Sequence, residues 1–329
     1  MEILFLAYNL ADTCSFYRSA GVIKDLQAKL GKEHNITALQ LNQADFTWPL
    51  ISRFDIVMMQ RPCTIESLSL CEYIKQLNIK LWVDWDDDLF HVNPENPTWF
   101  NYNKPEVQEV MKKILMLADV ITVPTEYLRQ VLSPLNQNIV VIPNAYNDTF
   151  FSRPEPGKRT NQVVWRGPAY HIKDIMTYRE AIERALTDFT EWRYIFMGGI
   201  NPSWFLCQQN NIQLYDMMDI AVYMKTLAEL APAAMHVPLH DNTFNHCKSN
   251  IAAIEGSYAG AVCIVPEWWN MPGTLSYTDN ESYYESLRSV LSGEVDKVAQ
   301  NIIAWEYIMD ELRLSKVNVE RLRVINSLS

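Results

Sequence analysis

Residues 238–260 are the most informative stretch of the sequence and read PLHDNTFNHCKSNIAAIEGSYAG. A strand is predicted just before this stretch, at residues 235–237, and another just after it, at residues 262–265. Between them lies a loop, followed by a predicted helix at residues 249–258. A strand, a helix and a second strand in this order predict a parallel sheet with the helix packed on one face.

The loop that leads into this helix has the chemistry of an anion-binding site. Asn245 and Ser249 are residue types that cap helices, and Lys248 lies at the helix entrance. Backbone N–H groups and the helix dipole favour an anion there, and a lysine adds a full positive charge, which predicts diphosphate binding. Glu255, two turns further on, is a predicted acceptor for sugar hydroxyls. The alternative interpretation is an ordinary capped helix with one surface lysine.

The same alternation of short apolar runs and amphipathic segments extends toward the N-terminus. Strands are predicted at residues 2–7, 54–59, 79–83, 120–123 and 139–142. Helices are predicted at residues 19–30, 65–77 and 105–118, and a further helix is predicted to begin at Glu126 with Thr125 as its cap.

A polar stretch containing Pro and Gly, residues 147–162, has linker composition and divides the chain. Beyond it, strands are predicted at residues 163–165 and 194–197, and helices at residues 175–186, 218–230 and 294–323. The predicted fold class is α/β, with two Rossmann-like domains facing a central cleft. The predicted bounds are 1–150 for the first domain, 151–162 for the linker, 163–296 for the second domain and 297–329 for a C-terminal helical segment. That last segment is expected to cross back to the first domain.

Composition excludes several classes of protein. The chain has 329 residues, a hydrophobic fraction of 48% and a formal net charge of −11, which suits a packed globular protein and disfavours a dedicated nucleic-acid binder. No apolar run is long enough to span a membrane, and the N-terminus lacks the basic region of a signal peptide. The six cysteines include no C-x-x-C pair, so a reduced, cytoplasmic protein without structural zinc is expected.

A second stretch with chemical potential is the acidic run at the end of the strand predicted at residues 79–83. It contains Asp84, Asp86, Asp87 and Asp88. Ionised carboxylates this close together repel one another, which disfavours their charged forms. Positive or polar groups are therefore expected to face them. Three interpretations remain open: a Mg²⁺ or Mn²⁺ site, an acceptor-side wall that positions a hydroxyl nucleophile, or a solvated turn.

Other candidate residues follow predicted strands. Tyr17 and Arg18 come after the first strand, with a surface arginine as the simpler interpretation. Arg166 and Gly167 follow the strand predicted at residues 163–165, and Gly167 permits close backbone approach to a phosphate. His171 is a candidate phosphate or sugar contact, whereas a lone histidine is more often structural. An ion pair between Arg166 and an acid such as Asp174 is the structural alternative for the arginine.

An ordered set of motifs resembles the GT-B-fold glycosyltransferases of the family-4-like, group-1 kind. The motifs are ADVITVPT at residues 118–125, VIPNAY at 141–146, VWRGPAYH at 164–171 and EGSYAGAV at 255–262. They occur in the order of the family and cover most of the chain. Many members carry two glutamates separated by seven residues, but Cys247 stands at the position of the first one. This departure resembles divergent phage or bacterial members of the family.

The resemblance implies roles for individual residues. The candidate catalytic residues are Arg166, Lys248 and Asp84, where the two cations would neutralise a departing diphosphate. The candidate donor-binding residues are Gly167, His171, Asn245, Ser249 and Glu255. The candidate acceptor-side residues are Tyr17, Arg18, Asp86 and Asp87. The first domain would bind the acceptor and the second the donor.

The activity implied by the resemblance is transfer of a sugar from a nucleoside-diphosphate sugar, expected to be a UDP-sugar, to a hydroxyl. Retention of configuration and independence from an essential metal are expected. Two classes of acceptor are expected: a glycan or lipid-linked saccharide, or a hydroxymethylated pyrimidine in phage DNA. The DNA alternative is favoured by the basic residues from Arg313 to Arg323 and by the Lys158–Arg159 pair. The alternatives are a non-catalytic nucleotide-sugar-binding protein and a metal-dependent phosphohydrolase that uses Asp84–Asp88. The oligomeric state is not predicted.

Overall fold

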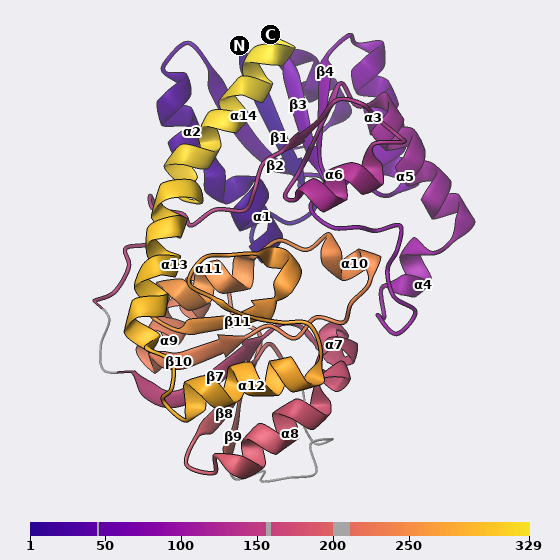
Figure 1. Cartoon of the computed structure of the whole chain (residues 1–329). Helices are drawn as coiled ribbons and strands as arrows, with labels where there is room; N and C mark the ends of the chain where they lie inside the picture. The colour runs from indigo at the N-terminus through magenta and orange to yellow at the C-terminus, as the bar shows by residue number, and fades with distance from the viewer. Residues whose placement is uncertain (45, 156–158, 200–210) are drawn as a thin grey trace. The chain divides into compact units, whose positions relative to one another are not determined.

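The computed structural model describes residues 1–44, 46–155, 159–199 and 211–329. These residues form two compact units. Unit 1 contains Met1–Phe151, His246–Ser249 and Leu312–Ser329, and unit 2 contains Ser152–Asn245 and Asn250–Glu311. Each unit is built on a six-stranded parallel sheet with helices around it (Figure 1). The predicted fold class, two Rossmann-like halves, is confirmed.

The sheet of unit 1 has the strand order β2-β1-β3-β4-β5-β6. Its strands are β1 Glu2–Ala7, β2 Asn35–Gln40, β3 Ile56–Gln60, β4 Lys80–Asp84, β5 Val120–Val123 and β6 Ile139–Val141. The helical elements of this unit are α1 Thr13–Arg18, η1 Ala20–Val22, α2 Ile23–Leu30, η2 Trp48–Arg53, α3 Ile65–Gln76, α4 Trp99–Tyr102, α5 Pro105–Leu117, α6 Glu126–Leu132 and α14 Leu314–Leu328. Gln60 pairs with Asp84, so β3 and β4 end side by side.

Alternating side chains cover the two faces of this sheet. Leu4 and Leu6 of β1 belong to a core shared with α3, α5 and α6. Ile3 and Phe5 of the same strand belong to a second core shared with α2 and α14. The period of two in the strand therefore assigns the helices to opposite faces.

The C-terminal segment forms two helices rather than the one predicted. Helix α13, Lys297–Glu311, belongs to unit 2, and α14 belongs to unit 1. Between them, Tyr146 N–H donates to the Leu312 carbonyl at 2.8 Å and Leu314 N–H donates to the Tyr146 carbonyl at 2.7 Å. These bonds form a parallel bridge between Tyr146 and Arg313, and this tertiary pairing interrupts the helix. The expected return of the chain end to the first half is confirmed, because α14 packs on β1 and β3 (Figure 1).

The sheet of unit 2 has the strand order β12-β11-β10-β7-β8-β9. Its strands are β7 Thr160–Arg166, β8 Arg193–Met197, β9 Ile212–Tyr215, β10 Pro232–His236, β11 Val262–Pro266 and β12 Leu275–Tyr277. The helical elements, beside α13, are η3 Ala169–His171, α7 Ile172–Thr177, α8 Arg179–Asp188, α9 Ile220–Leu230, α10 Thr243–His246, α11 Ile251–Tyr258, η5 Glu267–Trp269 and α12 Asn280–Leu291. Thr160 already belongs to β7, three residues before the predicted strand start.

Helices again lie on both faces of the sheet. Val262 and Ile264 of β11 share a core with α8 and α12. Helix α11 lies against the other face, because a Cβ on Gly256 would be 2.7 Å from Cys263 Sγ and 3.0 Å from Met235 Cβ. The glycine in the Glu255-Gly256 motif is therefore required for close packing of helix and sheet.

Three strands and four α-helices of the described chain were not predicted. The strands are β2, β9 and β12, each at an edge of its sheet, and the helices are α1, α4, α10 and α12. The helix predicted at residues 175–186 is also divided, into α7 and α8, at Tyr178. The Tyr178 ring packs against Tyr277 and Tyr283, and its hydroxyl donates to the Leu239 carbonyl at 3.2 Å. Local periodicity carries no information about these distant contacts.

Candidate active site

Each carboxylate of the acidic run at the end of β4 has a nitrogen-bearing side chain as a partner. Arg18 pairs with Asp84, Arg61 with Asp86, Lys248 with Asp87, and His91 Nδ1 with Asp88. The expectation that positive groups face these acids is confirmed. Among the described residues, no group of three or more His, Cys, Asp or Glu side chains is arranged to hold a metal ion.

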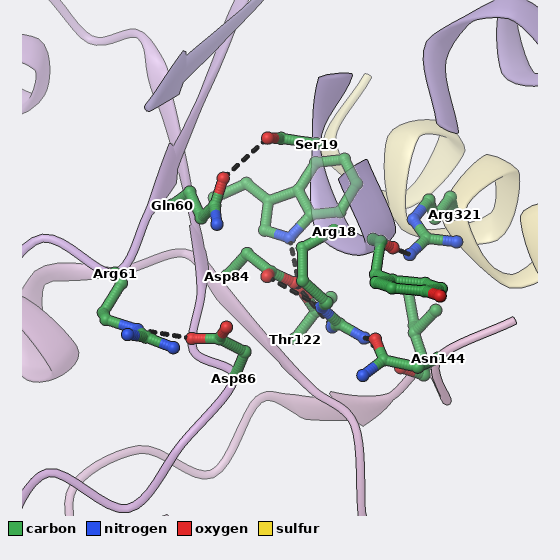
Figure 2. A network of polar contacts seen from close by, with 12 residues as sticks. Arg18, Ser19, Gln60, Arg61, Asp84, Asp86, Thr122, Asn144 and Arg321 are labelled. Atoms are coloured by element: carbon green, nitrogen blue, oxygen red, sulfur yellow. Dashed lines mark hydrogen bonds and ion pairs between the residues drawn. The ribbon is translucent and has the colours of Figure 1, made fainter. Parts of the chain in front are cut away.

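Arg18 and Asp84 form a buried, two-pronged ion pair (Figure 2). Arg18 Nε lies 2.9 Å and Nη2 2.7 Å from the two carboxylate oxygens of Asp84, and Thr122 Oγ1 donates to Asp84 at 2.6 Å. The side chains are only 1% and 3% exposed. Burial alone would lower the pKa of Arg18, but the attraction of Asp84 outweighs it and raises that pKa. In this structure Asp84 therefore acts as a positioning residue that fixes α1 to the end of β4.

Tyr17 contacts α14 through its backbone carbonyl. The Tyr17 side chain is buried, and its carbonyl accepts a hydrogen bond of 3.4 Å from Arg321 Nη2. Arg321 is fully buried close to Arg18, and desolvation together with the charge of Arg18 lowers its pKa to about 9 (Figure 2). Tyr17 and Arg18, predicted on the acceptor side, thus lie in the interior of unit 1.

Arg61 is a residue of this cluster that the sequence reasoning missed. It follows β3 directly, and its Nε donates to Asp86 Oδ1 at 2.6 Å (Figure 2). Burial would raise the pKa of Asp86, but Arg61 outweighs it and lowers that pKa. Arg61 has a φ of +47°, a strained conformation for a residue with a side chain. A cation at a strand end next to the acidic run was the available signal.

The short segment His246–Ser249 packs within unit 1. Lys248 Nζ lies 3.4 Å from Asp87 Oδ2, and both side chains are partly exposed, at 16% and 21%. Thr125 Oγ1 donates to the Cys247 carbonyl at 2.9 Å, and Asn144 Nδ2 donates to Ser249 Oγ at 2.8 Å. The capping interpretation of Ser249 is wrong, because the N-cap residue of α11 is Asn250, without a side-chain capping bond.

Asp88 is the most enclosed member of the acidic run. Its carboxylate lies 2.8 Å from His91 Nδ1 and accepts from the Phe90 N–H at 3.0 Å. Cys247 Sγ lies 3.8 Å from Asp88 Oδ2. Desolvation raises the pKa of Asp88, since His91 offsets it only in part. Cys247, at the position where the family resemblance leads one to expect a glutamate, therefore contacts a carboxylate.

In unit 2, Arg166 at the end of β7 pairs with Glu255 on α11. Arg166 Nε lies 2.8 Å from Glu255 Oε2, and the side chains are 23% and 1% exposed. The Tyr223 hydroxyl on α9 donates to the same carboxylate at 3.0 Å, and burial together with Glu255 raises the pKa of Tyr223 well above its usual value. The structural alternative for Arg166 is thus realised with Glu255 rather than Asp174, and Glu255 holds the guanidinium in place at the strand end.

Two glycines form the loops beside Arg166. Gly167 N–H donates to the Met197 carbonyl at 2.9 Å, and a Cβ on Gly198 would lie 2.2 Å from the Gly167 carbonyl oxygen. A Cβ on Gly167 would lie 2.9 Å from the Trp165 ring and 3.2 Å from His171 Cδ2. The imidazole of His171 therefore lies directly against bare backbone at the carboxyl edge of the sheet.

Asp174 connects His171 with the loop after β10. Its Oδ2 lies 2.8 Å from His171 Nδ1, and its Oδ1 accepts from Asn245 Nδ2 at 2.6 Å and from the His240 N–H at 3.0 Å. Asp174 is 5% exposed and Asn245 is fully buried. Asn245, predicted as a cap, therefore does not cap α11 but links Asp174 to the His240 carbonyl, at 2.8 Å.

The predicted candidates are thus distributed over two clusters. Unit 1 contains Tyr17, Arg18, Asp84, Asp86, Asp87, Lys248 and Ser249, and unit 2 contains Arg166, Gly167, His171, Asn245 and Glu255. Their binding and catalytic roles stay predictions. Of the basic residues noted for DNA, Arg321 is buried and Lys158 lies outside the described residues.

Solved structures share this architecture over nearly the whole chain. HepE of Anabaena, in complex with UDP, matches with a TM-score of 0.66 and 11% identity, covering 99% of this chain and 100% of that one. An α-glucosyltransferase in complex with UDP and a 13-mer DNA matches with a TM-score of 0.65, 12% identity and coverages of 99% and 98%. The chain has a GT-B fold. A UDP-forming trehalose-phosphate synthase of Burkholderia xenovorans matches this GT-B fold with a TM-score of 0.63, 14% identity and coverages of 99% and 99%.

No protein-family model matches the sequence, and neither does any curated protein. The identities to the solved structures are too low to indicate more than the GT-B fold, which can host different activities. In the described part of the chain, no helix is both long and apolar enough to cross a membrane.

Proposed function

We propose that this protein transfers a sugar from a UDP-sugar to a hydroxyl acceptor. The observation that carries the proposal is the cluster at the carboxyl edge of the unit 2 sheet. There Arg166, oriented by Glu255, lies beside the Gly167–Gly198 backbone contact and His171. The carboxyl edge of a parallel sheet is where such folds bind ligands, and bare glycine backbone beside a cation suits a diphosphate. Three solved GT-B structures, two of them complexes with UDP and one of a UDP-forming enzyme, support UDP as the nucleotide.

The proposed mechanism assigns the protein an electrostatic role. As the bond between the anomeric carbon and the diphosphate oxygen breaks, negative charge develops on the leaving diphosphate. The acceptor oxygen bonds to that carbon, and its proton passes to the leaving diphosphate. A preorganised guanidinium stabilises this charge in the transition state, and removal of one such donor typically costs 10²–10³ in rate. Arg166 takes this role, with Lys248 as the second predicted cation. The proposed donor-side residues are Gly167, Asn245, Ser249 and Glu255. Asp84 contributes to the proposed site by holding Arg18 in place.

Retention of configuration and independence from a metal belong to the proposal as well. The carboxylates of the acidic run have cationic partners, which supports an acceptor-side role for Asp86 and Asp87 rather than a Mg²⁺ site. The five described cysteines are all free, which supports the expected cytoplasmic location.

Nucleotide binding is the first test. UDP, ADP, GDP and several UDP-sugars are added to the protein, with EDTA or with Mg²⁺, and the unfolding temperature is measured. UDP at about 100 times its dissociation constant is expected to stabilise the protein by about 2.7 kcal/mol, with or without EDTA. Arg166→Ala is expected to lose most of this effect. Arg193→Ala, an exposed arginine at the start of β8 and so at the amino edge of the same sheet, is the matched control. Absence of any shift with uridine nucleotides would contradict the proposal.

Turnover then separates the acceptors. Release of UDP from UDP-sugars is measured with glycans, lipid-linked saccharides and DNA containing hydroxymethylated pyrimidines. A saccharide acceptor is favoured because the net charge of −11 opposes DNA binding, whereas the α-glucosyltransferase bound to DNA shows that a GT-B fold accommodates it. Binding of a UDP-sugar without transfer or hydrolysis would instead indicate a non-catalytic binding protein. Activity lost in EDTA and carried out on phosphate esters would favour the phosphohydrolase.

A further inference from the structure

We propose that Asp174 is a positioning residue that binds Nδ1 of His171 and stabilises its protonated ring, so that the imidazolium binds the diphosphate through Nε2. This inference rests on the proposed function. It concerns a carboxylate that the sequence analysis named as an ion-pair partner for Arg166.

The geometry around Asp174 carries the argument. The carboxylate is 5% exposed and accepts hydrogen bonds from the His240 N–H and from Asn245 Nδ2 on Oδ1. These two donors are neutral groups, and His171 Nδ1 lies 2.8 Å from Oδ2 of the same carboxylate. A carboxylate at this distance favours a proton on Nδ1 and stabilises the imidazolium. Nε2 is then the ring atom that can donate to a ligand.

The position of the ring adds the second observation. His171 Cδ2 lies 3.2 Å from where a Cβ of Gly167 would be, so the imidazole packs on the glycine backbone beside Arg166. Cδ2 is bonded to Nε2, which places Nε2 close to that backbone. An imidazolium there adds positive charge to the edge where the diphosphate is proposed to bind.

Asn245 points to a ligand or water at the same cluster. Its Nδ2 donates one hydrogen bond to Asp174 and one to the His240 carbonyl, and these two bonds fix the orientation of the amide. Its Oδ1 is buried, and no donor to it is found within the part of the chain that the structure describes. A buried acceptor without a donor is costly, so a hydroxyl or water is expected to complete it.

Other charged groups near His171 must be considered in any pH dependence. The groups on its own segment are Tyr170, Lys173 and Asp174. Arg166 lies at the end of β7, and His240 and Asp241 lie on the loop after β10. Asp174 Oδ2 lies within hydrogen-bonding distance of the His171 ring nitrogen Nδ1, at 2.8 Å.

The first experiment uses the free protein and does not depend on the proposed function. Protein with ¹⁵N-labelled histidine is titrated by NMR, and His171→Gln identifies the signals of His171. In the wild type we expect Nδ1 to carry the proton in the neutral ring and His171 to titrate above the ordinary value of about 6.5. Asp174→Asn keeps the volume and is expected to lower that pKa by about one unit or more. A wild-type His171 that titrates at or below 6.5, or with the proton on Nε2, would overturn the inference even if Asp174→Asn did not fold.

The second experiment measures the affinity for UDP between pH 5.5 and 8.5. Wild-type affinity is expected to fall by about tenfold or more as His171 loses its proton, the worth of one charge-assisted hydrogen bond. UDP also titrates in this range, and His171→Gln shows that contribution alone. In Asp174→Asn the fall is expected at lower pH, whereas Glu191→Gln, an exposed charge change in the same unit, leaves the profile unchanged.

The outcomes separate two failures. If the wild type binds UDP but Asp174→Asn weakens binding equally at every pH, Asp174 is merely structural and the inference is wrong. If the wild type does not bind UDP at any pH, the proposed function fails, and the NMR titration alone decides the role of Asp174.

Discussion

At the scale of single residues, buried charge in this protein is either paired or suppressed. The Arg18–Asp84 pair shows the first solution, with both ends of the guanidinium fork on the carboxylate. His236 shows the second, because it is fully buried at the end of β10 and desolvation lowers its pKa to about 3. A buried ion pair gives weak net stability, but loss of one partner is costly. The titration of His236 is therefore the cleaner quantity to measure.

His236 predicts a dependence of stability on pH. In the unfolded chain its pKa is near 6.5, whereas in the folded protein it is about 3. Between these values the unfolded state binds more protons, so the free energy of unfolding falls as the pH falls. The slope from this group is up to about 1.4 kcal/mol per pH unit. Urea unfolding between pH 4 and 7 is expected to show a smaller slope in His236→Gln than in the wild type.

Tyr283→Phe provides the control for this measurement. It removes the hydroxyl that contacts His236 Nδ1 but keeps the buried imidazole. Its slope with pH is expected to match that of the wild type, even if the variant is less stable at every pH. Equal slopes in His236→Gln and the wild type would show that His236 is not the group responsible.

At the scale of elements, glycines beside the ends of adjacent strands allow close contact between backbone segments. Gly167 directly follows β7 and Gly198 directly follows β8, and their backbones approach so closely that a side chain on Gly198 cannot be accommodated. Gly256 plays a comparable role in the middle of α11, where it permits contact with β10 and β11. These glycines therefore permit both the packing of α11 on the sheet and the backbone contact at the carboxyl edge, where the donor is proposed to bind.

Gly198 and Gly199 offer a matched pair of substitutions. Both have positive φ, at +122° and +79°, but a Cβ on Gly198 would be 2.2 Å from the Gly167 oxygen, whereas none of the described atoms lies within 4 Å of one on Gly199. Gly199→Ala is expected to cost about 1–2 kcal/mol through backbone strain alone. Gly198→Ala should cost clearly more and weaken UDP binding, as measured by urea unfolding and calorimetry. Similar losses in the two variants would show that the close approach is unimportant.

At the scale of the whole molecule, the chain returns to its first unit at its end. Helix α14 covers a face of the sheet that begins with residue 2, and Asn318 joins the two ends of the sequence. Asn318 Nδ2 donates to the Val22 carbonyl at 3.1 Å and to Asp25 Oδ2 at 2.8 Å. Its Oδ1 accepts from Arg321 Nη1 at 3.0 Å. The stability of unit 1 is therefore expected to depend on the last residues of the chain.

Asn318→Ala tests this dependence. The substitution leaves the buried Asp25 and Arg321 without these hydrogen bonds and is expected to destabilise unit 1 by about 2–4 kcal/mol. Asn326→Ala, on the exposed side of the same helix, should change stability by less than about 0.5 kcal/mol. Chemical denaturation followed by hydrogen exchange of β1 measures both. If the two variants were equally stable, α14 would not be anchored through Asn318.

The sequence by itself determined the α/β class, the buried parallel strands and several loop residues of the candidate site. Strands such as β3 and β10 are buried at every position, so they appear as short apolar runs whatever their neighbours. The missed strands β2, β9 and β12 are only partly buried, and local pattern is weak where burial is incomplete. The expectation of cations near the acidic run followed from charge alone.

Only the tertiary structure decided which groups meet. Arg61 pairs with Asp86 across 25 positions of sequence, and Lys248 with Asp87 across 161. The Glu255 carboxylate binds Arg166, and Asp174 accepts from His240 and Asn245 in the segment after β10, contacts that no local pattern encodes. Helix and strand propensities act over neighbouring residues, whereas ion pairs depend on how sheet order folds distant loops to one edge. For this reason the residue types of the candidate site were predictable from the sequence and their partners were not.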